Sequence, residues 1–186
     1  IILLVLIIIK QTIDNIRIKN KNQVLEKKAY VDLQTGLPNK SKCEEMLNNY
    51  EYITEPMGFV MFDLNNLKRA NDTYGHAVGD QLITNFARLL RNAIPAKDFV
   101  GRYGGDEFIA IITQTTKNEI LKIMDEVHDE VRNFNENIHK VEVSYAYGYA
   151  FSEDYADCTI KTLFDKADKH MYENKAIEKA KFETIV

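Results

Sequence analysis

Apolar residues recur along most of this chain at spacings that predict a mixed α and β domain. Helical spacing is found in four stretches, at roughly 40–50, 78–93, 120–134 and from 160 onward. A continuous apolar run at 58–64, a hairpin around Gly104 and strict alternation at 141–151 predict the strands. The predicted order is α-β-α-β-β-α-β-α. It closes most simply as an α+β fold, one sheet containing antiparallel strands with helices packed around it.

The alternating strand carries tyrosines at every second position, at Tyr145, Tyr147 and Tyr149. Such a stripe is compatible with a platform on which nucleic-acid bases stack. An aromatic face that packs into the core of the sheet is the more common use of the pattern, and we favour it here.

The first nine residues, 1–9, are all apolar and are followed by Lys10. A bilayer crossing needs about 20 apolar residues, and no initiator Met or basic stretch precedes them as in a complete signal peptide. The simplest interpretation is the C-terminal end of a truncated transmembrane helix, with a buried strand or core helix as the alternative. Between Lys10 and Lys28 there are six basic residues and two acidic ones, an excess that places the following part on the cytoplasmic side.

Residues 10–31 are polar with only sparse apolar positions, which predicts a juxtamembrane linker helix with a narrow apolar stripe. Such a helix can pair with a second copy of itself, although the spacing is too irregular to assign a coiled coil. Gly36 and Pro38 then interrupt the helix, and Asn39 can cap the next one. We therefore expect the main domain at 32–186.

The bulk composition narrows the function classes. The net charge of −4 argues against a general nucleic-acid binder, so we expect no nucleic-acid partner, and nucleotide binding would need local positive charge. Cys43 and Cys158 lie far apart without metal-ligand spacing and are expected to be reduced thiols. The chain has no Walker loop and no Gly-x-Gly-x-x-Gly dinucleotide fingerprint.

The hairpin at 102–108 places two glycines directly before two acids, Asp106 and Glu107. A tight turn of this kind is expected to need positive φ. The two acids suggest a turn that holds a metal ion and brings the backbone close to a polyanion, whereas a merely solvated turn is the plain alternative.

Asp63 ends the strand at 58–64, and if that strand neighbours the hairpin, its carboxylate converges with Asp106 and Glu107. Clustered carboxylates are costly without a cation, and oxygen ligands suit Mg²⁺ or Mn²⁺. Two such ions can stabilise the attacking and leaving oxygens of a phosphoryl transfer. Alternatively, Asp63 only caps the next helix.

The segment 65–80 is rich in hydrogen-bonding side chains and glycines. Lys68 could neutralise a terminal phosphate. Asn71 and Asp80 could together bind a purine, because a carboxylate accepts from the N1–H and the exocyclic amine of guanine. On composition alone, the segment could equally be an ordinary polar loop before a helix.

Taken together, these motifs resemble the GGDEF family of diguanylate cyclases. The resemblance runs from Asp32 to about Lys179 and includes the opening motif at 32–39, the 63–80 block, the signature at 102–108 and the closing segment at 167–175. It implies a polymerase-palm, nucleotidyl-cyclase-like fold. It also implies condensation of two GTP into cyclic di-GMP with release of two pyrophosphates across a homodimer. The expected location is the bacterial inner membrane, with the GGDEF domain in the cytoplasm.

The resemblance also assigns roles to individual residues. Two Mg²⁺ or Mn²⁺ ions per active site would be held by Asp63, by Asp106 and by the backbone carbonyl of Leu64. Asp106, Glu107 and Lys68 would be catalytic. The nucleotide would be bound by a larger set: Asn71, His76, Asp80, Gly104, Gly105, Lys175 and Lys179. For the last two, solvated lysines at a helix end are the alternative.

Several positions depart from the family pattern. Asn65 stands where many members have a second Asp, Leu67 where many have Phe, Gln34 where Leu is usual, and Lys179 where Arg is usual. The product-inhibition motif Arg-x-x-Asp reads Pro95-Ala96-Lys97-Asp98 here, so feedback inhibition through that site is expected to be absent or weak. The retained Asp80 favours cyclic di-GMP over a mixed product.

Two other classes of function stay open. A catalytically silent GGDEF-like module would bind GTP or a partner without turnover, although every acid and glycine of the turn is retained. A purely structural dimerisation domain would be indifferent to the loss of Asp106.

Overall fold

The computed structural model describes residues 2–49, 53–137 and 141–183, with side chains for 8–19, 21, 29–49, 53–137 and 141–176. The helices are α1 (Ile2–Tyr30), α2 (Lys40–Asn49), α3 (Leu67–Tyr74), α4 (His76–Ala93), α5 (Lys117–Glu136) and α6 (Ile160–Glu183). The strands are β1 (Met57–Leu64), β2 (Phe99–Arg102), β3 (Glu107–Thr113) and β4 (Tyr145–Phe151), and a short 3₁₀ turn, η1, covers Ser152–Asp154.

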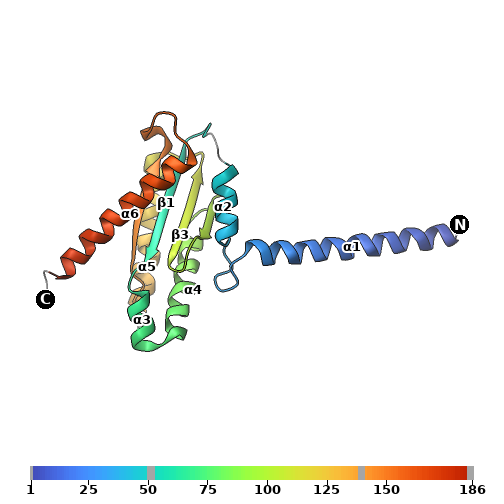
Figure 1. The fold of residues 1–186 in the computed structure, drawn as a ribbon, viewed down its shortest axis with the longest axis horizontal. Coiled ribbons are helices and arrows are strands. Elements are labelled where there is room, and N and C mark those ends of the chain that lie inside the picture. The colour runs from blue at the N-terminus through green and yellow to red at the C-terminus, as the bar shows by residue number, and fades with distance from the viewer. Residues whose placement is uncertain (1, 50–52, 138–140, 184–186) are drawn as a thin grey trace.

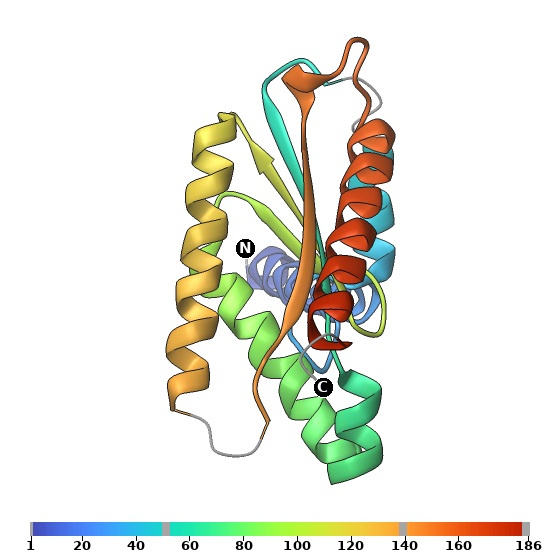
Figure 2. The same cartoon turned by 90° about the vertical axis from the view of Figure 1, so that its left-hand side faces the viewer.

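The four strands form one antiparallel sheet in the order β2-β3-β1-β4. Helices α4 and α5 cover one face, and α2 and α6 cover the other (Figure 1 and Figure 2). The predicted α+β class with helices around a single sheet is therefore confirmed. Every residue of β1 is buried, because the strand lies in the interior of the sheet with helices on both of its faces.

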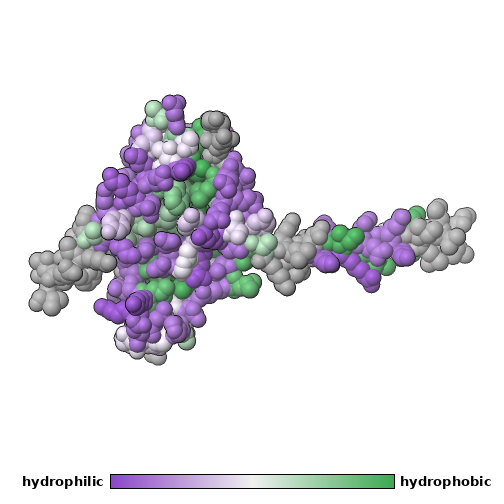
Figure 3. Space-filling view, in the orientation of Figure 1, coloured by the Kyte–Doolittle hydropathy of each residue, from purple (hydrophilic) through white to green (hydrophobic). Residues whose placement is uncertain are grey.

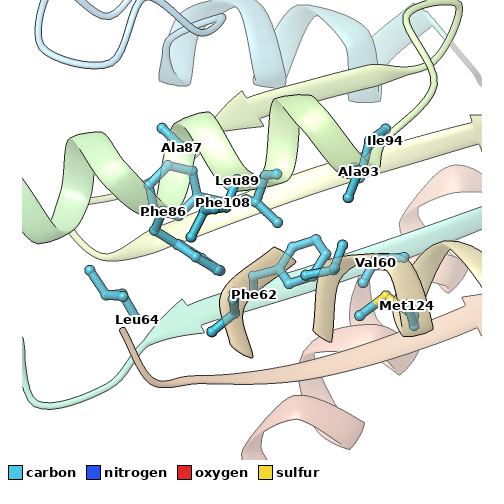
Figure 4. Close-up of a cluster of buried hydrophobic side chains, with 14 of the residues drawn as sticks. Val60, Phe62, Leu64, Phe86, Ala87, Leu89, Ala93, Ile94, Phe108 and Met124 are labelled. Atoms are coloured by element: carbon cyan, nitrogen blue, oxygen red, sulfur yellow. The ribbon is translucent and has the colours of Figure 1, made fainter. Parts of the chain in front are cut away.

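The two faces of β1 supply two hydrophobic clusters. Val60, Phe62 and Leu64 point toward α4 and α5, where the Phe86 ring packs edge-on against both Phe62 and Phe108 (Figure 4). The residues between them face α2 and α6, where Cys43 is fully buried. Burial raises the pKa of the Cys43 thiol to about 12, and both cysteines are free, as expected.

Strand β4 packs unusually close to α6. A Cβ added to Gly148 would lie 2.2 Å from the backbone oxygen of Ala167 and 2.2 Å from the backbone nitrogen of Met171. The buried neighbours on that face are small, Ala146 and Ala150, whereas the tyrosines lie half-buried against the cluster on the α5 side. The interpretation of the tyrosine stripe as core is therefore confirmed.

The alternating pattern was expected to give a strand from residue 141, but β4 begins only at Tyr145. The reason is a competing hydrogen-bond partner. The Asn135 side chain on α5 donates to the Val143 carbonyl at 2.8 Å and accepts from the Val143 N–H at 2.9 Å. The backbone of Val143 is thus satisfied by a helix side chain rather than by β1.

The reading of 65–80 as a polar loop is wrong for most of its length, because Leu67–Tyr74 forms α3 and His76 begins α4. Asn66 precedes α3 in the left-handed conformation (φ 60°), and Gly75 separates the two helices with φ 87°. The apolar positions of α3, Leu67, Ala70 and Tyr74, lie at helical spacing but are few, and only Ala70 is buried, so the segment is too short for this pattern to predict a helix.

Helix α1 extends away from the body of the domain as one continuous helix through the segments predicted as membrane end and linker (Figure 1). Several of its apolar side chains are exposed, among them Ile9, Ile13 and Ile16. Figure 3 shows hydrophobic surface among hydrophilic surface along this helix. Within the described part of the chain, we find no helix of sufficient length and apolar character to cross a membrane. The side chains of 1–7, where that prediction mainly falls, lie outside the described residues.

Candidate functional site

The pairing of β1 with β3 brings the predicted acids to one end of the sheet. Asp63 lies directly opposite Glu107 in the register, and the Leu64 N–H donates to the backbone oxygen of Asp106 at 2.9 Å. The condition on which their convergence depended, that the two strands are neighbours, is met. Asp63, Asp106 and Glu107 are thereby held on adjacent backbone segments at the point where β1 ends.

This end of the sheet concentrates negative charge. Burial raises the pKa of Glu107, and the nearby carboxylates of Asp106, Asp63 and Asp168 raise it further, against a smaller opposing effect of Lys175. Only 10% of the Asp63 side chain is exposed, and its Oδ1 pairs with Lys175 Nζ at 2.6 Å. Lys175 on α6 is thus the cation that offsets the charge of Asp63 in this structure.

The donor set is compatible with a hard divalent cation. Carboxylate oxygens are the ligands that Mg²⁺ and Mn²⁺ prefer, and a cation would relieve the repulsion that raises the pKa of Glu107. Across the residues with described side chains, however, no group of three or more His, Cys, Asp or Glu side chains is arranged to hold a metal ion. In this structure the Asp63 carboxylate is instead paired with Lys175.

The signature turn does not have the backbone that we expected. Gly36 and Gly75 are the glycines with positive φ in the described chain, so Gly104 and Gly105 do not adopt it. The connection between β2 and β3 spans four residues, 103–106, and a loop of that length does not require a primed two-residue turn. A Cβ added to Gly104 would lie 2.5 Å from Glu107 Oε2, so a larger residue there would displace the end of the Glu107 side chain.

Arg102 stabilises this turn, a role that the sequence did not predict. Its guanidinium donates to the Gly104 carbonyl at 3.1 Å and to the Gly105 carbonyl at 2.8 Å, and it forms an ion pair with Asp32 at 3.2 Å. Both charged residues belong to motifs recognised in the sequence, but nothing in their spacing indicates that they pair across 70 residues.

The same guanidinium is linked to α4 through Gln34. Arg102 donates to Gln34 Oε1 at 2.7 Å, and Gln34 Nε2 donates to Asp80 Oδ1 at 2.9 Å. The predicted guanine-binding carboxylate is therefore connected to the signature turn by two side chains.

Asn71 and Asp80 come from different helices that pack closely. A Cβ added to Gly79 would lie 1.9 Å from Asn71 Oδ1, so the Asn71 amide lies against the turn of α4 that carries Asp80. Lys68 is exposed in the first turn of α3, and His76 is the exposed first residue of α4. The structure places the Asn71 side chain against the turn of α4 that carries Asp80, whereas Lys68, His76 and Asp80 are all exposed.

The predicted contacts of α6 are only partly described. Lys175 was expected to bind a triphosphate, but here it contacts Asp63. The Lys179 side chain lies outside the described residues. The neighbouring Asn174 donates to the Tyr147 carbonyl at 2.8 Å, which fixes this turn of α6 on β4.

Asp98, the retained half of the product-inhibition motif, is directed toward β3. Its Oδ1 accepts from the Thr113 N–H at 3.1 Å and from the Thr113 hydroxyl at 3.3 Å. Its Oδ2 is buried and has no hydrogen-bond partner among the described residues.

Comparison with known proteins gives consistent matches. The family model described as "Diguanylate cyclase, GGDEF domain" matches residues 29–181. Diguanylate cyclase A of Treponema denticola is 27% identical over 165 residues, which cover 84% of this chain and 44% of that protein. An uncharacterized membrane protein of Staphylococcus saprophyticus is 28% identical over 172 residues, covering 87% of this chain and 48% of that protein. The chain thus spans about half the length of these relatives or less.

Solved structures agree on the fold. The GGDEF domain of YfiN (TpbB) from Pseudomonas aeruginosa is 28% identical with a TM-score of 0.69, covering 79% of this chain and 89% of that one. The coiled coil and GGDEF domain of DgcB from Caulobacter crescentus, solved with c-di-GMP, has a TM-score of 0.77 over 90% of this chain and 91% of that one. At 22% identity the second likeness shows the fold alone.

Proposed function

This chain belongs to the GGDEF-domain family of diguanylate cyclases, and on that basis we propose that it condenses two GTP into cyclic di-GMP and two pyrophosphates. The observation that carries the proposal is the acidic end of the sheet, where the intact signature turn lies beside Asp63 and a lysine from α6. No acid or glycine of the turn is lost, which argues against a silent GTP-binding module.

The site would hold two Mg²⁺ or Mn²⁺ ions through Asp63, Asp106 and the backbone carbonyl of Leu64. When bound, such ions supply positive charge at the reacting phosphate and at the attacking and leaving oxygens. Glu107 adds a further carboxylate beside them. Lys175 is released from Asp63 once that carboxylate has another cationic partner, and its ammonium is then available to the triphosphate.

The remaining predicted residues would bind and orient the nucleotide. Asp80 and Asn71 bind the guanine edge, and His76 lies at the start of the same helix as Asp80. Lys68 offsets phosphate charge, and the backbone at Gly104 and Gly105 lets the phosphates approach closely. Lys179 extends the basic contacts along α6.

Catalysis needs two domains, each with one GTP. The 3′-hydroxyl of each GTP attacks the α-phosphate of the other, so that two ester bonds form as two bonds to pyrophosphate break, and each hydroxyl releases its proton to solvent. A face-to-face homodimer satisfies this geometry, and the exposed apolar residues of α1 support pairing of two copies.

We also propose that the chain is tethered to the bacterial inner membrane through its N-terminal segment, with the catalytic domain in the cytoplasm. The support is the apolar run at 1–9 with the basic residues after it, together with relatives named as membrane proteins. Feedback inhibition through the motif at 95–98 is proposed to be absent or weak, because the Arg is missing.

The direct test is to incubate the purified, dimerised protein with GTP and Mg²⁺ and to measure cyclic di-GMP and pyrophosphate by chromatography. Product should form with the native chain and disappear with Asp106→Asn, which preserves the shape of the side chain. GTP binding without product in a folded dimer would support the silent module instead. Unchanged behaviour of Asp106→Asn would support a structural domain.

A further inference from the structure

We propose that Gln34 is a positioning residue that holds the Asp80 carboxylate for guanine and so contributes to base selectivity. The inference rests on the proposed function, because it requires that Asp80 binds guanine. It goes beyond it by giving a role to a residue that departs from the family pattern, where Leu is usual.

The hydrogen bonds fix the Gln34 amide in one orientation. Its Oε1 accepts from Arg102 at 2.7 Å, and its Nε2 donates to Asp80 Oδ1 at 2.9 Å and to the Asp80 backbone carbonyl at 3.4 Å. A guanidinium can only donate, and a carbonyl or an ionised carboxylate can only accept, so a flipped amide would lose all three bonds. A leucine at this position can make none of them.

Arg102, at one end of the link from Arg102 through Gln34 to Asp80, is held in place by several contacts. Only 13% of the Arg102 side chain is exposed, and the same guanidinium is held by Asp32 and by the carbonyls of Gly104 and Gly105. The hydrogen bond from Gln34 therefore restricts the motion of the Asp80 side chain, which is exposed on α4. Without the bridge, the Asp80 side chain is free to sample other rotamers.

The Asp80 carboxylate keeps acceptor sites for a base after it has accepted from Gln34. An ionised carboxylate has about four acceptor sites, and Gln34 uses one of them on Oδ1. The others can accept the N1–H and the 2-amino group of guanine. Holding the carboxylate in place before binding reduces the entropic cost of forming both bonds, so the second bond, to the 2-amino group, depends most on Gln34.

The test uses GTP and ITP, which differ only in the 2-amino group, and measures the dissociation constant of each by calorimetry, together with KM and kcat for GTP. Gln34→Met keeps the length of the side chain but removes the hydrogen bonds to Arg102 and to Asp80. Gln34→Glu keeps an acceptor for Arg102 but loses the donor to Asp80. Each variant should lower the preference for GTP over ITP by about fivefold, as the loss of one hydrogen bond would. The change should appear in KM more than in kcat.

The matched control is Arg91→Met. Arg91 also ties the opening loop to α4, by donating to the Gly36 carbonyl at 2.8 Å, but this bond does not involve Asp80. The Arg91→Met variant should leave the GTP-to-ITP preference unchanged. Equal loss in Arg91→Met would overturn the proposal, because general loosening of the loop would then explain the effect.

Asp80→Ala separates this inference from the proposed function. If Asp80→Ala abolishes the preference and the Gln34 variants keep it, the role of Gln34 is overturned and that of Asp80 stands. If Asp80→Ala also keeps the preference, the proposal fails together with the guanine role of Asp80, even where cyclic di-GMP is still formed. If the native protein does not bind GTP, the proposed function fails as well.

Discussion

At the scale of single residues, Asp63 is the most constrained group of the site. Its carboxylate is largely buried, and an ion pair with Lys175 at 2.6 Å compensates for the lost hydration. A divalent cation at Asp63 and the ammonium of Lys175 would compete for the same oxygen. Metal binding and the position of Lys175 are therefore expected to be coupled.

We expect Lys175→Met to destabilise the protein by about 2 kcal/mol in the absence of divalent cations, because Asp63 loses its partner. Added Mg²⁺ should then raise the melting temperature of the variant more than that of the native protein. The measurement is thermal unfolding with and without Mg²⁺. Lys169→Met, which removes an exposed pair with Glu173 on the same helix, is the control and should respond like the native protein. Equal Mg²⁺ shifts in all three proteins would contradict competition between Lys175 and a metal ion for Asp63.

Asp32 gives a prediction about pH. Burial raises its pKa, but hydrogen bonds from the Thr35 hydroxyl and N–H and the charge of Arg102 outweigh this, so its pKa lies below the ordinary value of 3.8. A lowered folded-state pKa stabilises the protein above pH 3.8, and that stability is lost as the pH falls through the folded value. Asp32→Asn should therefore be less stable than the native protein at pH 7 by about 1 kcal/mol. The difference should shrink in acid.

The measurement is urea unfolding of both proteins at several pH values down to about pH 3, within the window set by linkage. Asp165→Asn, on the exposed side of α6, serves as the control and should match the native protein throughout. A stability difference that is constant with pH would show that the charge of Asp32 is not what Arg102 recognises.

The motif at 95–98, which keeps Asp98 but lacks its Arg, predicts that the product does not inhibit GTP turnover. Added cyclic di-GMP should leave the initial rate of GTP turnover unchanged, because Pro95 supplies no guanidinium. Pro95→Arg should not create inhibition by itself, since Asp98 is engaged by Thr113 and directed away from solvent. Initial rates measured over a range of cyclic di-GMP concentrations check both statements. Inhibition of the native protein would reveal another product site.

At the scale of elements, the sequence predicts what depends on regular burial and misses what depends on specific polar contacts. The buried run at 58–64 and the stripes at 78–93 and 120–134 correspond to β1, α4 and α5 because periodic burial leaves a periodic pattern. The late start of β4 could not be predicted, since it depends on a side chain of Asn135 that bonds Val143.

The site shows the same division. The apolar runs place Asp63 at the end of one buried strand and Glu107 at the start of another, but continuous runs do not specify which strands pair, so their convergence could be expected only if the two strands were neighbours. The links from Arg102 to Asp32 and through Gln34 to Asp80 join side chains distant in sequence, and no periodicity encodes them. Lys175 at Asp63, rather than at a phosphate, likewise depends on how α6 crosses the sheet.

The contact between α6 and β4 predicts the effect of Gly148→Ala. The new methyl group would lie 2.2 Å from backbone atoms of α6, which cannot turn aside as a side chain can. We expect a loss of about 3 kcal/mol in the free energy of unfolding, together with slower GTP turnover as the displaced α6 carries Lys175 away from the proposed triphosphate site. Gly105→Ala, where an added Cβ meets nothing within 4 Å, is the stability control. Equal stability of the two variants would show that α6 packs less tightly than described.

At the scale of the whole molecule, we assign different roles to the folded domain and to helix α1, which projects from it. The folded body contains the acids, the guanine-binding candidates and the described lysines, but under the proposed reaction each copy would bind one GTP and two are needed. Helix α1 makes few contacts with the body beyond α2, and it exposes 44% of Ile13 and 54% of Ile16. Pairing of two copies through this helix would bury these side chains and raise the effective concentration of the second domain.

We therefore expect the double variant Ile13→Glu with Ile16→Glu to lower the specific activity at low protein concentration, because like charges on facing helices oppose pairing. Activity should recover as the concentration is raised, since each domain is unchanged and only the encounter is weakened. Gln11→Glu with Asn15→Glu adds the same charge at nearby polar positions and should behave like the native chain. Specific activity and molar mass by light scattering, measured over the same concentration range in detergent, test this directly. A double variant that stays dimeric and fully active at every concentration would assign dimerisation to the folded body instead of α1.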